Sequence, residues 1–188
     1  MATTIRHNER MSVADYLALN EETPPRHDYV AGELFEVEPS TARHNKLVGN
    51  IIVRLGAADD PRYHVLTTGV LLRAADDIYY YPDIMVVTHD EEGDPYIMRH
   101  PRLIIEVASP TSLTIELREK LLVYCRLPSL QTYLIFETNA QRVYQAFRDA
   151  EGAWQSATLE GNAVVPIPCL DTELSLAAVY RNLPPVSE

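Results

Sequence analysis

The feature that most constrains the fold is a strand–helix–strand pattern in the second half of the chain. The run RLIIEVAS, residues 102–109, is short and nearly all apolar, which is typical of a strand at the centre of a sheet. A helical segment follows it, from Thr111 or Ser112 to just before Pro128. A second apolar run, QTYLIFET, occupies residues 131–138. Two strands joined through a helix pair in parallel by a right-handed crossover, so this part of the sequence predicts an α/β unit.

Further elements are predicted on both sides of this unit, because apolar residues at helical spacing indicate helices and alternating ones indicate strands. We expect helices at 12–20, 41–55 and 175–183. We expect strands in a bent hairpin at 28–38, in a hairpin of two long runs at 64–74 and 78–88, and in a hairpin at 142–159, with a loop at 89–101. The predicted fold class is mixed α/β (α+β), a central sheet flanked by helices. We expect a single domain over residues 1–188, with its core at about 12–180.

The composition narrows the class of protein. Of the 188 residues 46% are apolar, enough for a core without disulfides or a structural metal. The two cysteines, Cys125 and Cys169, form no framework and no zinc pattern, which favours a reducing compartment. The sequence has no apolar run long enough for a signal peptide or a membrane span, so we expect a cytoplasmic protein without a membrane partner.

The net charge of −11 argues against nonspecific coating of nucleic acid, which depends on Lys and Arg neutralising phosphates. It does not exclude an enzyme with an acidic metal site and a local basic rim. Residues that could form such a rim lie on two predicted helices: Arg43, Lys46, Arg54, Arg118 and Arg126. The alternative for these residues is that they are scattered solvated charges.

Two acids lie in apolar strands, where an ionised carboxylate costs free energy unless it is paired, solvated or bound to a metal. Asp83 opens the run YPDIMVV and is either a turn residue or a ligand. Glu106 is the only charged residue within LIIEVAS, on one face with Ile104 and Ala108. If their strands are neighbours, both carboxylates meet at one end of the sheet. Such a pair suits Mg²⁺ or Mn²⁺, which take oxygen ligands and keep waters for substrate phosphates.

Lys120 follows Glu106 by 14 positions, on the crossover helix. The chain has 14 arginines and only two lysines, Lys46 and Lys120, so a lysine here favours a need for a compact point charge. The alternative is an exposed helix residue paired with Glu116 at i, i+4.

These residues carry a resemblance to a known superfamily. Pro82-Asp83, then Glu106, then Lys120 resembles the PD-(D/E)XK nucleases, which include many restriction endonucleases. More closely, the chain resembles a family of small restriction endonuclease-like proteins with an ordered set of short motifs, which here read Gly32-Glu33, His44, Pro82-Asp83, Glu106-Val107 with Ser109-Pro110, Lys120 with Tyr124, and Tyr133-Leu134. The superfamily lysine would stand at Ala108, and the family resembled supplies it from the next helix. Glu116 and Glu137 stand where that family often has aspartate.

The resemblance implies a restriction endonuclease-like fold, a DNA substrate, a homodimer and the following residue roles. Asp83 and Glu106, with the backbone carbonyl of Val107, would hold Mg²⁺ or Mn²⁺, which activates a water for attack on the phosphodiester. Lys120 would orient that water or stabilise the transition state. Glu33 would complete the acidic cluster, binding a second metal or the attacking water.

Three residues keep a structural alternative, and a fourth has a supporting role. Glu33 could be a hairpin-edge acid beside a glycine. His44 could contact phosphate or a scaffolding carboxylate, or be a structural histidine. Tyr124 falls one helical turn after Lys120, where packing is the simpler role, and Glu116 on the same side could position Lys120.

The preferred function is a divalent-metal-dependent DNA endonuclease that uses a metal-activated water. The alternative is a catalytically silent, dimeric module that keeps the nuclease fold for binding or regulation, which the net acidity favours. An enzyme using Asp and Glu as general acid and base is disfavoured by Lys120. Serine or cysteine hydrolase chemistry finds no GxSxG motif and no histidine paired with either cysteine.

Overall fold

The computed structural model describes residues 10–22, 26–37, 39–67, 69–89 and 93–186. Its helical elements are α1 (Val13–Glu22), α2 (Ala42–Gly56), α3 (Leu113–Ile115), the π-helical turn η1 (Glu116–Lys120), α4 (Leu121–Tyr124), the 3-10 turn η2 (Pro168–Leu170) and α5 (Leu176–Val179). Its strands are β1 (His27–Val30), β2 (Glu33–Glu36), β3 (Tyr63–Thr67), β4 (Leu71–Ala75), β5 (Ile78–Tyr80), β6 (Ile84–Thr88), β7 (Ile97–Met98), β8 (Pro101–Ala108), β9 (Thr132–Glu137), β10 (Arg142–Arg148), β11 (Trp154–Glu160), β12 (Val164–Ile167) and β13 (Thr172–Ser175).

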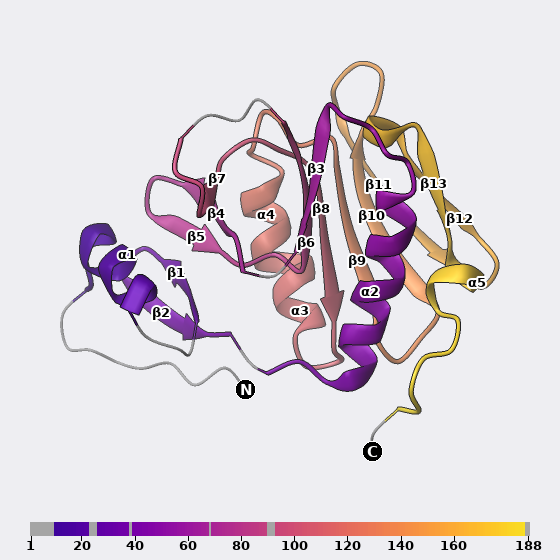
Figure 1. The fold of residues 1–188 in the computed structure, drawn as a ribbon, viewed down its shortest axis with the longest axis horizontal. Coiled ribbons are helices and arrows are strands. Elements are labelled where there is room, and N and C mark those ends of the chain that lie inside the picture. Colours follow the sequence, from indigo (N-terminus) through magenta and orange to yellow (C-terminus); the bar gives the residue numbers. More distant parts are fainter. Residues whose placement is uncertain (1–9, 23–25, 38, 68, 90–92, 187–188) are drawn as a thin grey trace.

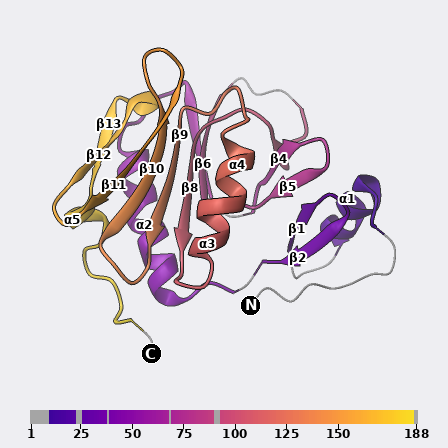
Figure 2. The same ribbon diagram turned by 180° about the vertical axis from the view of Figure 1, so that it is seen from behind.

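A six-stranded mixed sheet in the order β11-β10-β9-β8-β6-β3 forms the centre of the molecule. Strands β8 and β9 pair in parallel, and α3, η1 and α4 connect them as one continuous helical segment (Figures 1 and 2). This confirms the predicted strand–helix–strand unit. The predicted mixed α/β class is confirmed as well.

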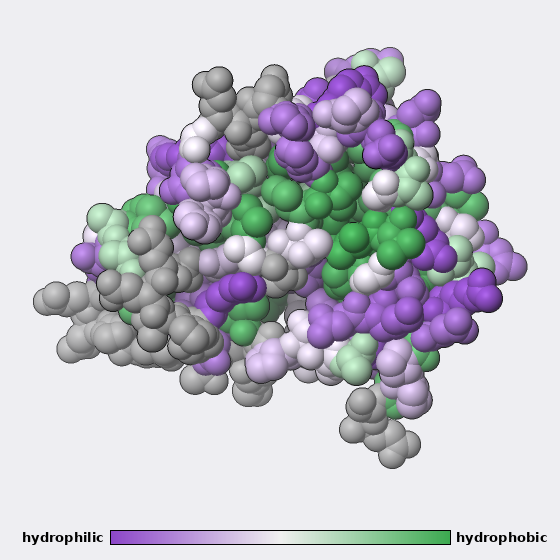
Figure 3. All heavy atoms as spheres, viewed as in Figure 1, coloured by the Kyte–Doolittle hydropathy of each residue, from purple (hydrophilic) through white to green (hydrophobic). Residues whose placement is uncertain are grey.

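Helices cover both faces of this sheet. On one face α2 buries Leu47, Ile51 and Leu55 against alternate residues of β6, β8 and β9 (Figure 1). Thr41 caps this helix by accepting a hydrogen bond from the His44 N–H, so it begins where the sequence predicts. On the opposite face α4 packs Tyr124 onto the remaining residues of the same strands (Figure 2). The outer side of α2 is not uniformly polar: hydrophobic residues gather over β3 and the neighbouring part of α2 in Figure 3, and Val53 on α2 is 70% exposed.

A second, five-stranded sheet has the order β2-β1-β5-β4-β7. The predicted bent hairpin at 28–38 is its β1–β2 pair, which turns at Ala31 and Gly32, both with positive φ. Its own hydrophobic cluster centres on the stacked rings of Tyr16 and Tyr29.

The prediction of a hairpin of two long continuous strands is wrong, because neither strand is continuous. Each run divides between the two sheets: β3 pairs with β6 in the larger sheet, and β4 pairs with β5 in the smaller one. The first break lies by Gly69, whose φ of +128° favours glycine. The second lies at Tyr81-Pro82-Asp83, between β5 and β6. A proline has no N–H for a ladder, so a strand ends naturally there.

The C-terminal part differs from the prediction in two places. The hairpin at 142–159 is confirmed as β10 and β11. The helix expected at 175–183 is only the four residues of α5, and a β12–β13 hairpin before it was not predicted. Prolines at 166 and 168 argue against strands in the sequence pattern. Pro166 is tolerated because it lies at an exposed position of a two-stranded sheet.

Two smaller points complete the comparison. The short β7 lies in the predicted loop at 89–101, and positions 38, 68 and 90–92 of the predicted elements lie outside the described residues. Among the described residues, no helix has both the length and the apolar character needed to span a bilayer.

Candidate active site

Asp83 lies where the chain passes from the smaller sheet into the larger one. Its Oδ2 accepts a hydrogen bond of 2.7 Å from the Val107 N–H and lies 3.2 Å from His44 Nε2. Its own backbone N–H donates to Glu106 Oε2 at 3.3 Å. The carboxylate that opens this strand is therefore held between β8 and α2, and it meets Glu106 at one end of the sheet, as the sequence predicts.

Glu106 is buried in β8, with 3% of its surface exposed, and both of its oxygens have partners. Besides the Asp83 N–H on Oε2, its Oε1 accepts hydrogen bonds from Lys120 Nζ at 3.1 Å and from the Tyr124 hydroxyl at 3.0 Å. Tyr124 thus packs in the core, as the sequence favours, and its hydroxyl also restricts the orientation of Glu106.

The π-helical turn η1 explains how one helix supplies several site residues. In an α-helix, residues at i, i+4 and i+8 drift about 40° per step around the axis. A π-turn is underwound and reduces this drift, and such turns occur often at functional sites. Glu116, Lys120 and Tyr124 consequently all face the sheet and are all buried. Lys120 is therefore not an exposed helix residue, although its i, i+4 pairing with Glu116 is present at 3.3 Å.

Glu116 completes the surroundings of Lys120 on the helix side. Its Oε2 accepts a hydrogen bond of 3.0 Å from the hydroxyl of Tyr133 on β9, while its Oε1 faces Lys120 Nζ. Its carboxylate therefore cannot rotate without losing one of two partners. This geometry is the one expected of a residue that positions Lys120.

One acid of the cluster was not singled out from the sequence. Asp28, on β1, places its Oδ2 3.7 Å from Lys120 Nζ, and its Oδ1 accepts a hydrogen bond of 2.9 Å from the Tyr81 N–H. The signal that could have found it is the one that found Asp83, namely an aspartate within a short strand of otherwise apolar or aromatic residues.

Glu33 does not join this group. It is exposed at the start of β2, and within the described chain it forms no hydrogen bond or ion pair with the buried acids. Its register opposite Val30 turns it to the same face of the hairpin as Asp28, but nearer to the turn. The position expected for Glu33 inside the cluster is occupied by Asp28.

The cluster carries more buried negative charge than its lysine can neutralise. Burial, reinforced by the charge of Glu116, raises the pKa of Glu106 well above its ordinary value, and Lys120 opposes this only in part. Burial likewise raises the pKa of Glu116 and of Asp28. For Lys120 burial alone would lower the pKa, but the carboxylates of Glu106, Glu116 and Asp28 outweigh it and raise the pKa. The lysine stays charged, and the acids around it favour a further cation.

The donor set fits a hard divalent cation. Within the part of the chain that the structure describes, no three His, Cys, Asp or Glu side chains gather as a metal-ligand set. The oxygen atoms at this end of the sheet belong to the carboxylates of Asp83 and Glu106 and to the carbonyl of Val107, which is the type of ligand that a hard divalent cation takes. The register Ile84↔Ile105, continued along the strands, sets Val107 opposite Pro82. Pro82 has no N–H to donate to the Val107 carbonyl. Mg²⁺ is commonly held by one or two carboxylates with waters and substrate oxygens in its other positions.

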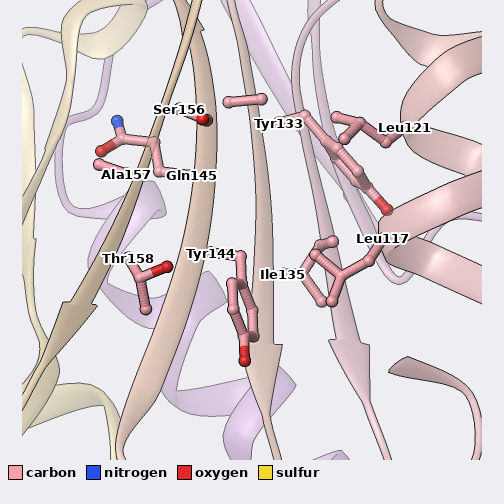
Figure 4. A pocket seen from close by; sticks show the side chains of 10 residues that line it. Leu117, Leu121, Tyr133, Ile135, Tyr144, Gln145, Ser156, Ala157 and Thr158 are labelled. Atoms are coloured by element: carbon pink, nitrogen blue, oxygen red, sulfur yellow. The ribbon is translucent and has the colours of Figure 1, made fainter. Parts of the chain in front are cut away.

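A pocket of about 320 Å³ lies beside this cluster and not on it (Figure 4). Leu117 and Leu121 of the helical segment form one wall, and Thr158 of β11 contributes to the other. Its lining contains no charged side chain, so it offers no cation for a phosphate and no carboxylate for a metal. It adjoins the cluster through Tyr133, whose hydroxyl points toward the helix and bonds Glu116.

Comparison with known proteins identifies the family of the chain. A family model described as "Putative restriction endonuclease" (Uma2) matches residues 13–179, which include every residue of the cluster. The chain belongs to the Uma2 family. Two curated relatives from Synechocystis sp. are both described as uncharacterized proteins: one is 26% identical over 156 residues, covering 80% of this chain and 88% of the relative, and the other is 20% identical over 182 residues, covering 93% of each.

A solved structure shares the fold of this Uma2 chain. It is described as a "putative nuclease belonging to DUF820" from Anabaena variabilis, and it superposes with a TM-score of 0.75 over 90% of this chain and 97% of its own length, at 16% identity. At this identity the likeness shows the fold. The restriction endonuclease-like architecture expected from the sequence is therefore confirmed at the level of fold.

Proposed function

We propose that the protein is a divalent-metal-dependent DNA endonuclease of the PD-(D/E)XK type, with its lysine supplied by the helix after the glutamate strand. One observation carries the proposal: Asp83 and Glu106 meet at one sheet end with Lys120 Nζ 3.1 Å from Glu106. Membership of a family described as "Putative restriction endonuclease" supports the same reaction class.

Each site residue has a task in this reaction. Asp83, Glu106 and the carbonyl of Val107 would hold Mg²⁺ or Mn²⁺, which when bound lowers the pKa of a coordinated water and offsets charge on the scissile phosphate. The Tyr124 hydroxyl and the Asp83 N–H fix the rotamer of Glu106, and His44 orients Asp83. Lys120 presents a positive charge beside Glu106 to stabilise the charge that develops on the phosphate.

The substrate would be DNA. The protein would bind it as a homodimer in the cytoplasm. Of the residues that could line a basic rim, Lys46, Arg118 and Arg126 are exposed and available for phosphate contacts. Arg43 and Arg54 are not, because Arg43 donates to the Thr138 and Pro184 carbonyls and Arg54 to the Asn50 carbonyl.

Plasmid nicking tests the proposal. The purified protein should nick supercoiled plasmid in Mg²⁺ or Mn²⁺ and lose this activity in EDTA. Glu106→Gln and Lys120→Met should each lower the rate by about a hundredfold or more, because the first removes a metal ligand and the second removes the positive charge beside the phosphate. Glu119→Gln is a matched control, since Glu119 is exposed on the same helical segment, and it should keep the wild-type rate. Nicking that survives in Glu106→Gln and Lys120→Met would refute the proposal.

A second candidate function is a catalytically silent nuclease-fold module for binding or regulation. Two observations favour it: Lys120 already faces three carboxylates, and two of the five possible rim residues are bonded to backbone carbonyls. Calorimetry separates the candidates. If the protein is an endonuclease, it should bind Mn²⁺, and Asp83→Asn should abolish this binding. If it is a silent module, no Mn²⁺ binding should depend on Asp83.

A further inference from the structure

Asp28 differs from the other acids of the cluster in where it comes from. Asp83 and Glu106 lie at the end of the six-stranded sheet and Lys120 on the helix that covers it, whereas Asp28 lies on β1 of the five-stranded sheet. Its side chain is only 16% exposed, and a buried aspartate of this kind costs free energy unless its charge is compensated. The compensating charge in its surroundings is the ammonium of Lys120.

The two oxygens of Asp28 serve two parts of the site. Strands β1 and β5 pair through Tyr29↔Tyr79, and the chain then leaves this ladder for Pro82 and Asp83. At that point Asp28 Oδ1 accepts the hydrogen bond of the Tyr81 N–H, in place of a backbone carbonyl. The other oxygen, Oδ2, faces Lys120 Nζ. One side chain thus links the segment that carries Asp83 to the helix that carries Lys120.

The position of the ammonium follows from opposed attractions. Glu106 and Glu116 lie 3.1 and 3.3 Å from Lys120 Nζ, and Asp28 lies 3.7 Å from it, with the ring of Tyr80 5.3 Å away. Glu106 comes from the strand and Glu116 from the helix of Lys120 itself, whereas Asp28 and the ring of Tyr80 attract the ammonium from the smaller sheet. Of these two, Asp28 is the group that carries a charge. A neutral side chain at position 28 would let the ammonium settle onto the other two carboxylates.

We infer that Asp28 is a positioning residue of the proposed nuclease, which fixes the ammonium of Lys120 through its charge. The inference rests on the proposed function for its catalytic consequence, but the contact between Asp28 and Lys120 can be tested without activity. Asp28→Asn separates the two tasks of the side chain, because the amide oxygen can still accept from the Tyr81 N–H while the charge is lost.

The composition of the chain makes the test direct, since Lys46 and Lys120 are its only lysines. Protein labelled with ¹³C and ¹⁵N in lysine gives two side-chain signals, and Lys46→Arg identifies which belongs to Lys120. Asp28→Asn should move the Lys120 Cε and Nζ signals and leave those of Lys46 in place. Asp77→Asn, an exposed acid of the same small sheet, should move neither.

Nicking at saturating Mg²⁺ gives the second readout. Asp28→Asn should lower the rate about tenfold, as expected when a charged group is displaced by a fraction of an ångström to an ångström. Asp28→Glu keeps the charge and should leave the Lys120 signal nearer to the wild-type position than Asp28→Asn does, which also serves if the asparagine variant does not fold. A Lys120 signal that is unmoved in Asp28→Asn would overturn the inference. Inactive wild-type protein whose Lys120 signal responds to Asp28→Asn would instead overturn the proposed function and leave the contact standing.

Discussion

At the scale of single residues, the site depends on one position that has no functional group in its side chain. Pro82 lies opposite Val107 in the continued register of β6 and β8. Any other residue there would present an N–H to the Val107 carbonyl and would compete with a metal for it. In the proposed nuclease, the proline of the short motif leaves the Val107 carbonyl without a backbone hydrogen bond, so that the carbonyl can bind the metal.

This reasoning predicts the behaviour of Pro82→Ala. We expect Mn²⁺ affinity to fall about tenfold, as for other changes in the surroundings of metal ligands, while the circular dichroism spectrum stays that of a folded protein. Titration calorimetry measures the affinity. Pro166→Ala, at an exposed position of β12, is the matched control and should bind Mn²⁺ as the wild type does. Unchanged affinity in Pro82→Ala would mean that the Val107 carbonyl is not a ligand.

The raised pKa of Glu106 gives a second prediction at this scale. Burial and the neighbouring Glu116 raise this pKa, so the folded protein holds a proton on Glu106 at pH values where a free glutamate is ionised. A metal ion needs the ionised form, so binding releases that proton and the affinity rises as the pH rises toward the folded-state pKa. Calorimetry in two buffers of different ionisation enthalpy measures the released protons. Proton uptake, or affinity that falls as the pH rises over this interval, would contradict the assignment.

At the scale of elements, the π-helical turn is the least regular part of the site and the part that aligns it. We predict that deleting the exposed Arg118, which leaves room only for an α-helical turn, keeps the helix but moves Lys120 relative to Glu116. Plasmid nicking should fall by up to about a hundredfold, because such a displacement is of the order of an ångström. Circular dichroism and nicking assays test this together. Full activity in the deletion variant would show that the alignment is not needed.

The sequence predicts elements well where the local pattern and the tertiary environment agree. The apolar runs of β8 and β9 and the capped, amphipathic α2 were predicted for that reason. The pattern predicts one strand across Gly69, because apolar residues lie on both sides of it. The positive φ of this glycine instead allows the chain to pass from one sheet to the other. The β12–β13 hairpin was missed because its prolines argue against strands in a large sheet but not in a two-stranded one.

For the site, the sequence predicted acids that interrupt apolar strands, and it did not predict which acids meet. Glu106 and Lys120 were found because each is exceptional in its own segment. The resemblance indicates Glu33 through its Gly32-Glu33 motif, whereas the structure places Asp28 in the cluster. Both acids lie on one face of the same hairpin, and only the docking of the two sheets buries one and leaves the other exposed. No local pattern contains that information.

At the scale of the whole molecule, stability depends on the face of the large sheet that α2 covers. Leu134 is fully buried there with Leu103, Phe136 and their neighbours. We predict that Leu134→Ala lowers the free energy of unfolding by about 2–5 kcal/mol, through lost burial and the cavity that remains. Leu122→Ala, at a position that is 66% exposed, should change it by no more than about 0.5 kcal/mol. Urea denaturation measures both values, and equal values for the two variants would contradict this view of the core.

The chain crosses between the two sheets at Tyr81-Pro82-Asp83. Because of this crossing, we expect local unfolding to begin in the smaller sheet. The smaller sheet has its own tyrosine-rich cluster, separate from the core around α2. An opening of that sheet alone would withdraw Asp28 and loosen Asp83 while β8, β9 and α2 stay packed. We therefore predict that the acidic cluster opens before the scaffold that carries it, so that amide hydrogens of β1 and β5 exchange with solvent sooner than those of β8.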